Sequence, residues 1–113
     1  MELQYNELEN GIRLIKLNGN LDIMGVNAVD VKFAGYCSGE KARVLVDLSG
    51  VGYLASIGIR LLASNAKSLL SRGGKMVLLN PTPEVREVLE MTGVPAVIPM
   101  YDNLESAQAV LMA

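Results

Sequence analysis

The stretch Arg43-Val-Leu-Val-Asp-Leu-Ser-Gly-Val-Gly-Tyr-Leu-Ala-Ser-Ile-Gly58 decides the fold of this chain. Its first six residues form a β-branched apolar run, which is typical of a central strand buried on both faces. We expect a glycine-rich loop over residues 49–54 to follow. Ser56 is then predicted to be the N-cap of a helix that runs to about Arg72 and is stopped by Gly73-Gly74.

Strand and helix patterns alternate on both sides of this stretch. Two antiparallel strands are predicted near residues 2–8 and 11–18, joined at Asn10-Gly11, a pair that is typical of hairpin turns. The remaining predicted elements are a helix over 24–37, a strand over 75–80, a helix after Thr82 that ends at Gly93, a strand over 97–100 and a helix after Asn103. We therefore expect an α/β fold, a mixed β-sheet with an N-terminal hairpin and then alternating helices and strands, flanked by about four helices.

Length and composition limit the chemistry that is open to the chain. Its 113 residues suit one domain with its own core, so we take residues 1–113 as a single domain. The absence of histidine excludes histidine-based nucleophile pairs and metal sites, and the single cysteine, Cys37, excludes an internal disulfide. The net charge of −2 argues against a nucleic-acid-binding surface. No apolar run reaches the roughly 20 residues of a membrane span, so we expect a cytoplasmic protein without metal or cofactor.

Ser56 is the most prominent candidate for a functional residue. It follows a glycine-rich segment, but no Gly-Lys-Ser/Thr sequence makes this a phosphate-binding loop, and hydrolysis is excluded because no histidine can act as base. Two readings stay open: a structural N-cap, which is the commoner role of such a serine, or a phosphorylation site at a helix N-terminus. Asp22, after the second strand, likewise reads either as a turn or helix cap or as a carboxylate near a phosphorylated Ser56.

The helix after Ser56 has an uneven polar side. A helical wheel places its core side on Ile59, Leu62, Ala63, Ala66, Leu69 and Leu70. Ile57 and Leu61 then fall on the polar side, one turn apart and flanked by Arg60 and Ser64. We interpret these four residues as a partner-binding patch; the alternative is two incidental exposed apolar side chains.

Several motifs together resemble the STAS domain family, whose members include anti-sigma factor antagonists. The central segment Asp47-Leu-Ser-Gly-Val-Gly-Tyr-Leu-Ala-Ser56-Ile-Gly-Ile-Arg-Leu-Leu62 resembles the family signature. Gly19-Asn-Leu-Asp22, Ser71-Arg-Gly-Gly-Lys-Met-Val-Leu78 and Pro83-Glu-Val-Arg-Glu-Val-Leu-Glu-Met-Thr-Gly93 are similar to three further family segments. The resemblance covers nearly the whole chain, and the lack of a transmembrane part favours the free-standing antagonist type.

The resemblance implies a regulatory binding protein and not an enzyme. Such a protein, when unphosphorylated, binds a switch kinase of the anti-sigma class; the kinase phosphorylates the serine, here Ser56 with Asp22 and Gly58 beside it, and a separate phosphatase reverses the change. The family usually has an acid before the serine and often a Ser or Thr after it, where this chain has Ala55 and Ile57. Two alternatives follow: an interaction subunit of another assembly, such as a transporter accessory or a signalling scaffold, that is not phospho-regulated, and a small enzyme or nucleotide binder.

Overall fold

The five strands lie in the sheet in the same order as in the sequence, β1-β2-β3-β4-β5. The structure is a computed structural model that describes residues 1–113. The strands are β1 (Glu2–Glu7), β2 (Arg13–Leu21), β3 (Arg43–Leu54), β4 (Lys75–Leu79) and β5 (Met100–Tyr101). β1 is antiparallel to β2, and the other neighbours are parallel. The predicted mixed sheet with an N-terminal hairpin is confirmed.

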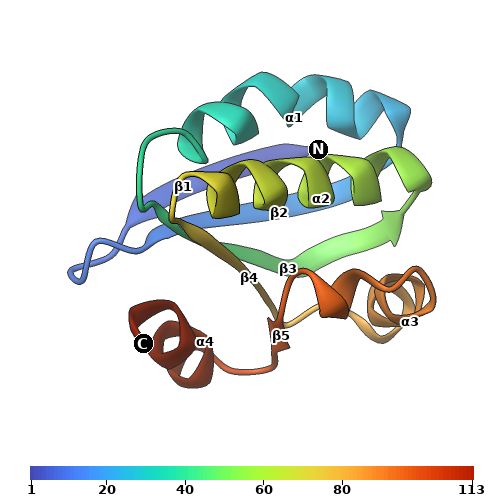
Figure 1. The fold of residues 1–113 in the computed structure, drawn as a ribbon. Helices are drawn as coiled ribbons and strands as arrows, with labels where there is room; N and C mark the ends of the chain where they lie inside the picture. Colours follow the sequence, from blue (N-terminus) through green and yellow to red (C-terminus); the bar gives the residue numbers. More distant parts are fainter.

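Helices cover both faces of the sheet. α1 (Ile23–Tyr36) and α2 (Ser56–Ser71) lie side by side on one face, and α3 (Pro83–Met91) and α4 (Leu104–Met112) lie on the other (Figure 1). A short 3-10 helix, η1 (Val94–Ala96), follows α3. The larger core cluster includes Phe33, Leu62 and Leu89, and a smaller one holds Leu45 and Leu111 beneath α4.

Most local signals in the sequence act as expected. Thr82 caps α3 by accepting a hydrogen bond from the Val85 amide, and Asn103 caps α4 by accepting one from the Ser106 amide. α1 begins and ends within one residue of the predicted limits. No helix of the structure combines the length and the apolar character that a membrane crossing requires.

Two predicted element boundaries are wrong. The expected loop over residues 49–54 is strand, because β2 continues to Leu21 and pairs with β3 as far as Leu54 across two register shifts. Gly50 permits this pairing, since a Cβ there would lie 1.9 Å from Oδ1 of Asn18. The expected strand over 97–100 is strand only at Met100, because the chain first forms η1, and β5 is the short pair Met100–Tyr101.

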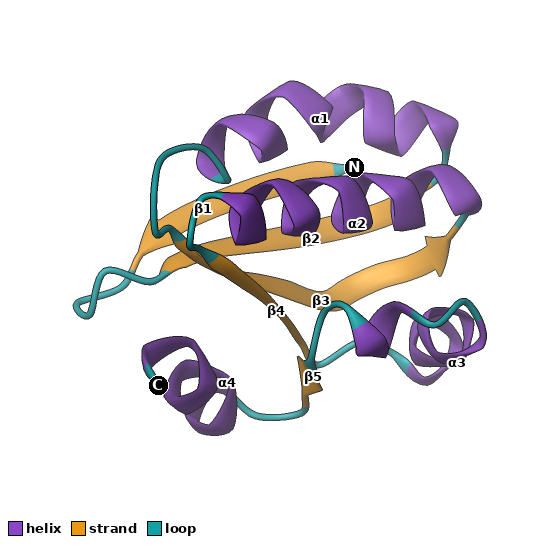
Figure 2. Cartoon of the chain, in the orientation of Figure 1, coloured by secondary structure: helices purple, strands orange, loops and turns teal.

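Loops gather at two opposite ends of the sheet (Figure 2). At one end, β2 leads into α1 and β3 leads into α2, so residues 21–25 and 54–58 meet. At the other end, the segments that follow α1 and α2 enter β3 and β4. The sequence-predicted site residues all belong to the first of these ends or to the first turns of α2.

Candidate functional site

Ser56 lies at the carboxyl end of the sheet, where two strands finish together. Leu21 and Leu54, the last residues of β2 and β3, are register partners, and the amide of Ala55 donates a 3.0 Å hydrogen bond to the carbonyl oxygen of Leu21. Asp22 and Ser56 therefore each begin a chain segment that leaves this shared edge. The expectation that they lie at the same end of the sheet is confirmed.

The prediction that Ser56 is the N-cap of α2 is wrong by one residue. Ala55 is the N-cap, with extended backbone angles (φ −89°, ψ 170°), and no side chain caps the helix. Ser56 is already helical, so its hydroxyl is not placed as an N-cap acceptor for the amides of the first turn. The side chain is exposed. The first-turn amides of α2 thus lack a side-chain partner, and the serine beside them is accessible from solvent.

Asp22 is the N-cap of α1. Its Oδ1 accepts a 2.8 Å hydrogen bond from the amide of Gly25, and the side chain is half-buried. Of the two readings that the sequence left open, the helix cap is the one with a contact in the structure. Gly25 supports this geometry, because a Cβ there would lie 1.9 Å from the carbonyl oxygen of Asn20.

Gly58 lets the first turn of α2 pack closely on the ends of β2 and β3. A Cβ at this position would lie 2.8 Å from the carbonyl oxygen of Leu21 and 2.7 Å from Cδ1 of Leu54. The residue is buried, and such distances are too short for any side chain without a shift of the surroundings. Gly58 therefore sets the height of Ser56 above the sheet.

The helical wheel placed Leu61 wrongly. Leu61 is 8% exposed and belongs to the larger core cluster, whereas Leu70, expected in the core, is 52% exposed. The buried residues of α2 are Gly58, Leu61, Leu62, Ala66 and Leu69. Because α1 packs beside α2 (Figure 1), α2 is covered on its flank as well as toward the sheet, and the core side is turned relative to the wheel.

The other three residues of the expected patch stay at the surface. Ile57 is half-buried and packs against the core cluster, while Arg60 and Ser64 are exposed. Ile57 lies directly beside Ser56 in the first turn of α2, and the other two follow along the helix. The structure therefore leaves Ile57, Arg60 and Ser64 as candidates for partner contact and removes Leu61.

Three exposed apolar side chains at this end were missed by the sequence reasoning. Ile23 is 65% exposed, Met24 83% and Tyr53 57%. Ile23 and Met24 directly follow the cap Asp22, and Tyr53 is the register partner of Asn20 beside that cap. A signal was available for Met24 alone: the buried stripe of α1 is Gly25, Val26, Val29 and Phe33, and Met24 lies off it, whereas Ile23 precedes Val26 by three residues, which is a helical spacing.

A shallow hollow adjoins these side chains. It has a volume of about 450 Å³ and is lined by Met1, Gly19, Asn20, Asp22, Met24, Gly25 and Ala28. No group of three or more His, Cys, Asp or Glu residues is placed to hold a metal ion. The same end of the sheet thus carries an exposed hydroxyl, a helix N-terminus and exposed apolar side chains, features that suit contact with another protein.

The one ionisable group with a strongly shifted pKa lies far from Ser56. Cys37, after the end of α1, is buried, and burial raises the pKa of its thiol to about 12, an effect that the nearby Arg13 and Arg72 partly offset. A thiol with such a pKa is a poor nucleophile near neutral pH. Cys37 is therefore a core residue and not part of the site.

Comparison with known proteins places this chain in a family. The sequence model of the STAS domain matches residues 6–107. An anti-sigma F factor antagonist from Lysinibacillus sphaericus is 28% identical over 94 residues, which cover 82% of this chain and 80% of the relative.

Solved structures share the fold. An anti-sigma factor antagonist from Mycobacterium paratuberculosis superposes with a TM-score of 0.88 at 20% identity, covering 99% of this chain and 94% of that one. A STAS domain protein from Planctomyces limnophilus, described as an anti-sigma-factor antagonist, has a TM-score of 0.87 at 23% identity, with 98% of both chains covered. With the family model matching most of its length, the chain belongs to the STAS domain family.

Proposed function

We propose that this protein is an anti-sigma factor antagonist that is switched by phosphorylation of Ser56. In the unphosphorylated state it binds an anti-sigma factor that is also a serine kinase. Phosphorylation of Ser56 by that kinase breaks the complex, and a separate serine phosphatase restores it. The observation that carries this proposal is the exposed Ser56 at the uncapped N-terminus of α2, amid apolar side chains.

The partner surface that we propose is centred on Ser56. It consists of Ile23, Met24, Tyr53, Ile57, Arg60 and Ser64, and we call it the Ser56 surface. The first three supply exposed apolar area, the part of an interface in which binding energy concentrates. Arg60 adds a positive charge that suits an acidic group of the partner. Leu61 is left out because it is buried in this chain.

Phosphorylation at this place changes the surface without breaking the fold. A phosphoryl group adds a charge of about −1.5 to −2. On this chain it meets the free amides and the positive end of α2, which stabilise it. At an interface built on Ile23, Met24 and Tyr53, the same charge must lose water on docking, which is costly. The modified protein is therefore expected to stay folded and to lose its partner.

A second function is favoured by one feature of the sequence. Ala55 stands where the family usually has an acid, and the side chain of Ala55 gives a kinase nothing to recognise electrostatically. If no kinase modifies Ser56, the Ser56 surface serves as a constitutive docking surface in another assembly. Phosphorylation then plays no part in its regulation.

One experiment separates the two functions. The partner kinase is first captured from native extract with the wild-type protein as bait. Each variant of the protein is then incubated with this kinase and ATP, and the intact mass of the variant is measured. Phospho-regulation predicts one added phosphate on wild type, none on Ser56→Ala, and one on the matched control Ser71→Ala, an exposed serine at the far end of the same helix and outside the Ser56 surface. A captured partner that adds no phosphate to wild type favours the constitutive docking domain. Equal phosphate on the Ser56→Ala variant overturns the assignment of the site.

A further inference from the structure

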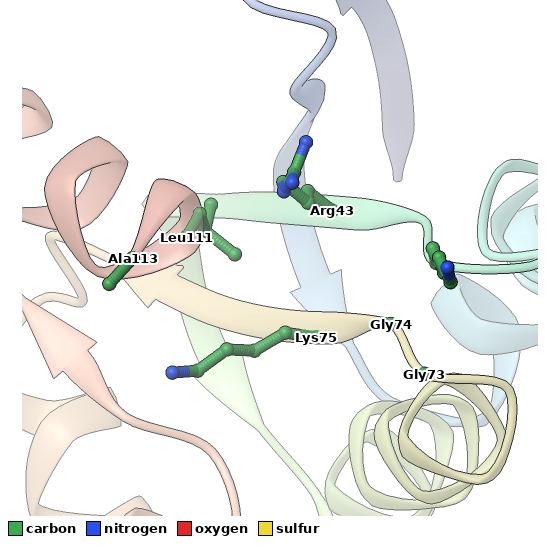
Figure 3. A pocket seen from close by; sticks show the side chains of 7 residues that line it. Arg43, Gly73, Gly74, Lys75, Leu111 and Ala113 are labelled. Carbon is green, nitrogen blue, oxygen red and sulfur yellow. The ribbon is translucent and has the colours of Figure 1, made fainter.

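A basic pocket lies at the opposite end of the sheet from Ser56, where β3 and β4 begin. It has a volume of about 240 Å³ and is lined by Lys41, Arg43 and Lys75, by the Gly73-Gly74 turn and by the end of α4 (Figure 3). No acidic side chain lines it. The pocket is separate from the Ser56 surface, because the two lie at opposite ends of β3.

No acidic side chain neutralises the positive charge of this pocket. Arg43 and Lys75 are register partners on neighbouring strands, an arrangement in which like charges repel one another. The one ion pair of the structure joins Arg86 and Asp102, so none of the three pocket cations pairs with an acidic side chain. A cluster of this kind concentrates positive potential in a concave site, which raises the local concentration of anions.

The floor of the pocket is a rigid crossing of two chain segments. The amide of Lys41 donates to the carbonyl oxygen of Arg72, and the amide of Lys75 donates to that of Ala42, both at 2.9 Å. The Arg72 guanidinium adds bonds to the carbonyl oxygens of Gly39 and Cys37. The three cations are therefore carried by backbone whose position is fixed before any ligand arrives.

Lys41 adds a second observation that points to a ligand. Its φ is 56°, in the left-handed region that residues other than glycine rarely adopt. Such strained positions cluster at ligand-binding sites, where the surroundings hold them in place. The stem of Lys41 runs over Gly73, with its Cγ 3.4 Å from where a Cβ of residue 73 would be. The strained backbone thus brings the Lys41 side chain over the pocket.

We propose that this pocket binds a small anion that carries phosphate groups with two or more negative charges. The backbone amides of residues 41 and 73–75 are all used inside the protein, so recognition falls to the two ammonium groups and the guanidinium fork of Arg43. Those groups suit dense oxyanion charge, and the fork can hold two phosphate oxygens at once. In Figure 3, Lys75 reaches toward the end of α4 while Arg43 leaves its strand in another direction, and a bound anion would draw them together. The small concave site favours such a ligand over an extended protein segment.

The test is a titration followed by the backbone amide signals in NMR, with inorganic pyrophosphate and inorganic phosphate as probes at constant ionic strength. Saturable shifts centred on residues 41–43 and 73–75 are expected, with tighter binding of pyrophosphate. A Lys41→Gln/Lys75→Gln variant should bind pyrophosphate at least about tenfold more weakly, a difference of about 1.4 kcal/mol. The matched control Lys32→Gln/Lys67→Gln removes two exposed lysines elsewhere and should bind like wild type.

Three results would overturn the proposal. They are the absence of saturable shifts, shifts centred away from the pocket, and equal affinity in the Lys41→Gln/Lys75→Gln variant. The same spectra show whether each variant is folded, so a loss of binding is not confused with a loss of structure. The outcome is independent of the phosphorylation switch, because neither probe nor variant involves Ser56.

Discussion

The carbonyl oxygen of Leu21 accepts a 3.0 Å hydrogen bond from the amide of Ala55, and this bond holds together the two segments that leave the sheet beside the site. On one side of the bond Asp22 caps α1; on the other Ser56 starts α2. The distance between Asp22, the cap of α1, and Ser56 in α2 is therefore fixed by the main chain. A substitution that shifts one of the two segments should also shift the other.

Substitution of Gly58 tests this close packing. Gly58→Ala places a Cβ 2.8 Å from the Leu21 carbonyl oxygen, and overpacking of this kind costs about 1–3 kcal/mol in the free energy of unfolding. The control is Gly35→Ala in α1, where a Cβ meets nothing within 4 Å. Gly35→Ala should stabilise by roughly 0.5–1 kcal/mol, the helical advantage of alanine over glycine. Urea unfolding measures both, and a stability of Gly58→Ala equal to wild type would contradict the packing described.

Asp22 is expected to matter for stability as well as for the site. Asp22→Ala removes the N-cap of α1 and should lower the free energy of unfolding by about 0.5–2 kcal/mol. Asp22→Asn keeps a good capping oxygen and should be close to wild type. The asparagine variant also removes the charge alone, so its rate of Ser56 phosphorylation reports on the electrostatic role of Asp22. Equal stability of the alanine variant and wild type would show that the cap bond contributes nothing.

Leu61 is expected to behave as a core residue. Leu61→Ala should cost about 2–5 kcal/mol, because it removes a side chain that is 8% exposed and leaves a cavity between α2 and its neighbours. The matched control is Leu70→Ala, at a side chain that is 52% exposed, and it should change stability far less. Thermal unfolding of the two variants side by side decides the orientation of α2. A larger loss of stability in Leu70→Ala than in Leu61→Ala would support the orientation of α2 that the helical wheel predicted.

Residues whose roles were predicted correctly are positioned by contacts with near neighbours in the sequence, and residues whose roles were missed are positioned by contacts with distant segments. Thr82 and Asn103 cap helices through contacts three residues away, so their roles are readable locally. The strand character of residues 49–54 depends on pairing with β2, far away in sequence, and the burial of Leu61 depends on α1 lying beside α2. The site was located from Ser56 and Asp22. Ile23 and Tyr53 were missed because single exposed apolar residues carry no pattern, and Met24 was missed although it lies off the buried stripe of α1.

Cys37 should be unreactive while the protein is folded. Burial raises the pKa of its thiol from 9.0 to about 12, so at pH 8 the folded protein holds far less thiolate than the unfolded chain. Because the pKa of the thiol is higher in the folded protein, burying Cys37 as a neutral thiol carries no pH-dependent cost below pH 9. The free energy of unfolding then falls as the pH rises from 9 toward 12. A thiol reagent at pH 8 should react roughly two to three orders of magnitude faster in denaturant than in buffer. Equal rates would mean that α1 opens readily around Cys37.

The exposed apolar residues of the Ser56 surface are expected to carry partner binding. Met24 and Tyr53 are 83% and 57% exposed, so truncating either removes contact area for a partner with little effect on the fold. Met24→Ala and Tyr53→Ala should each weaken binding to the captured partner about tenfold, or 1.4 kcal/mol, a modest value for an interface hot spot. The matched control is Met112→Ala, an exposed methionine on α4 at the other side of the sheet, which should bind like wild type.

Binding by calorimetry and melting temperatures, measured on the same samples, separate the outcomes. If Met24→Ala and Tyr53→Ala keep full affinity while Ile57→Ala loses it, the partner contacts α2 alone and the α1 side of the Ser56 surface is not used. If all three keep full affinity and wild-type melting temperatures, the partner docks elsewhere, and the closeness of these side chains to Ser56 has no part in binding. A loss confined to Met24 and Tyr53 instead ties recognition to the edge where β2 and β3 end, the same edge that the Leu21–Ala55 bond holds rigid.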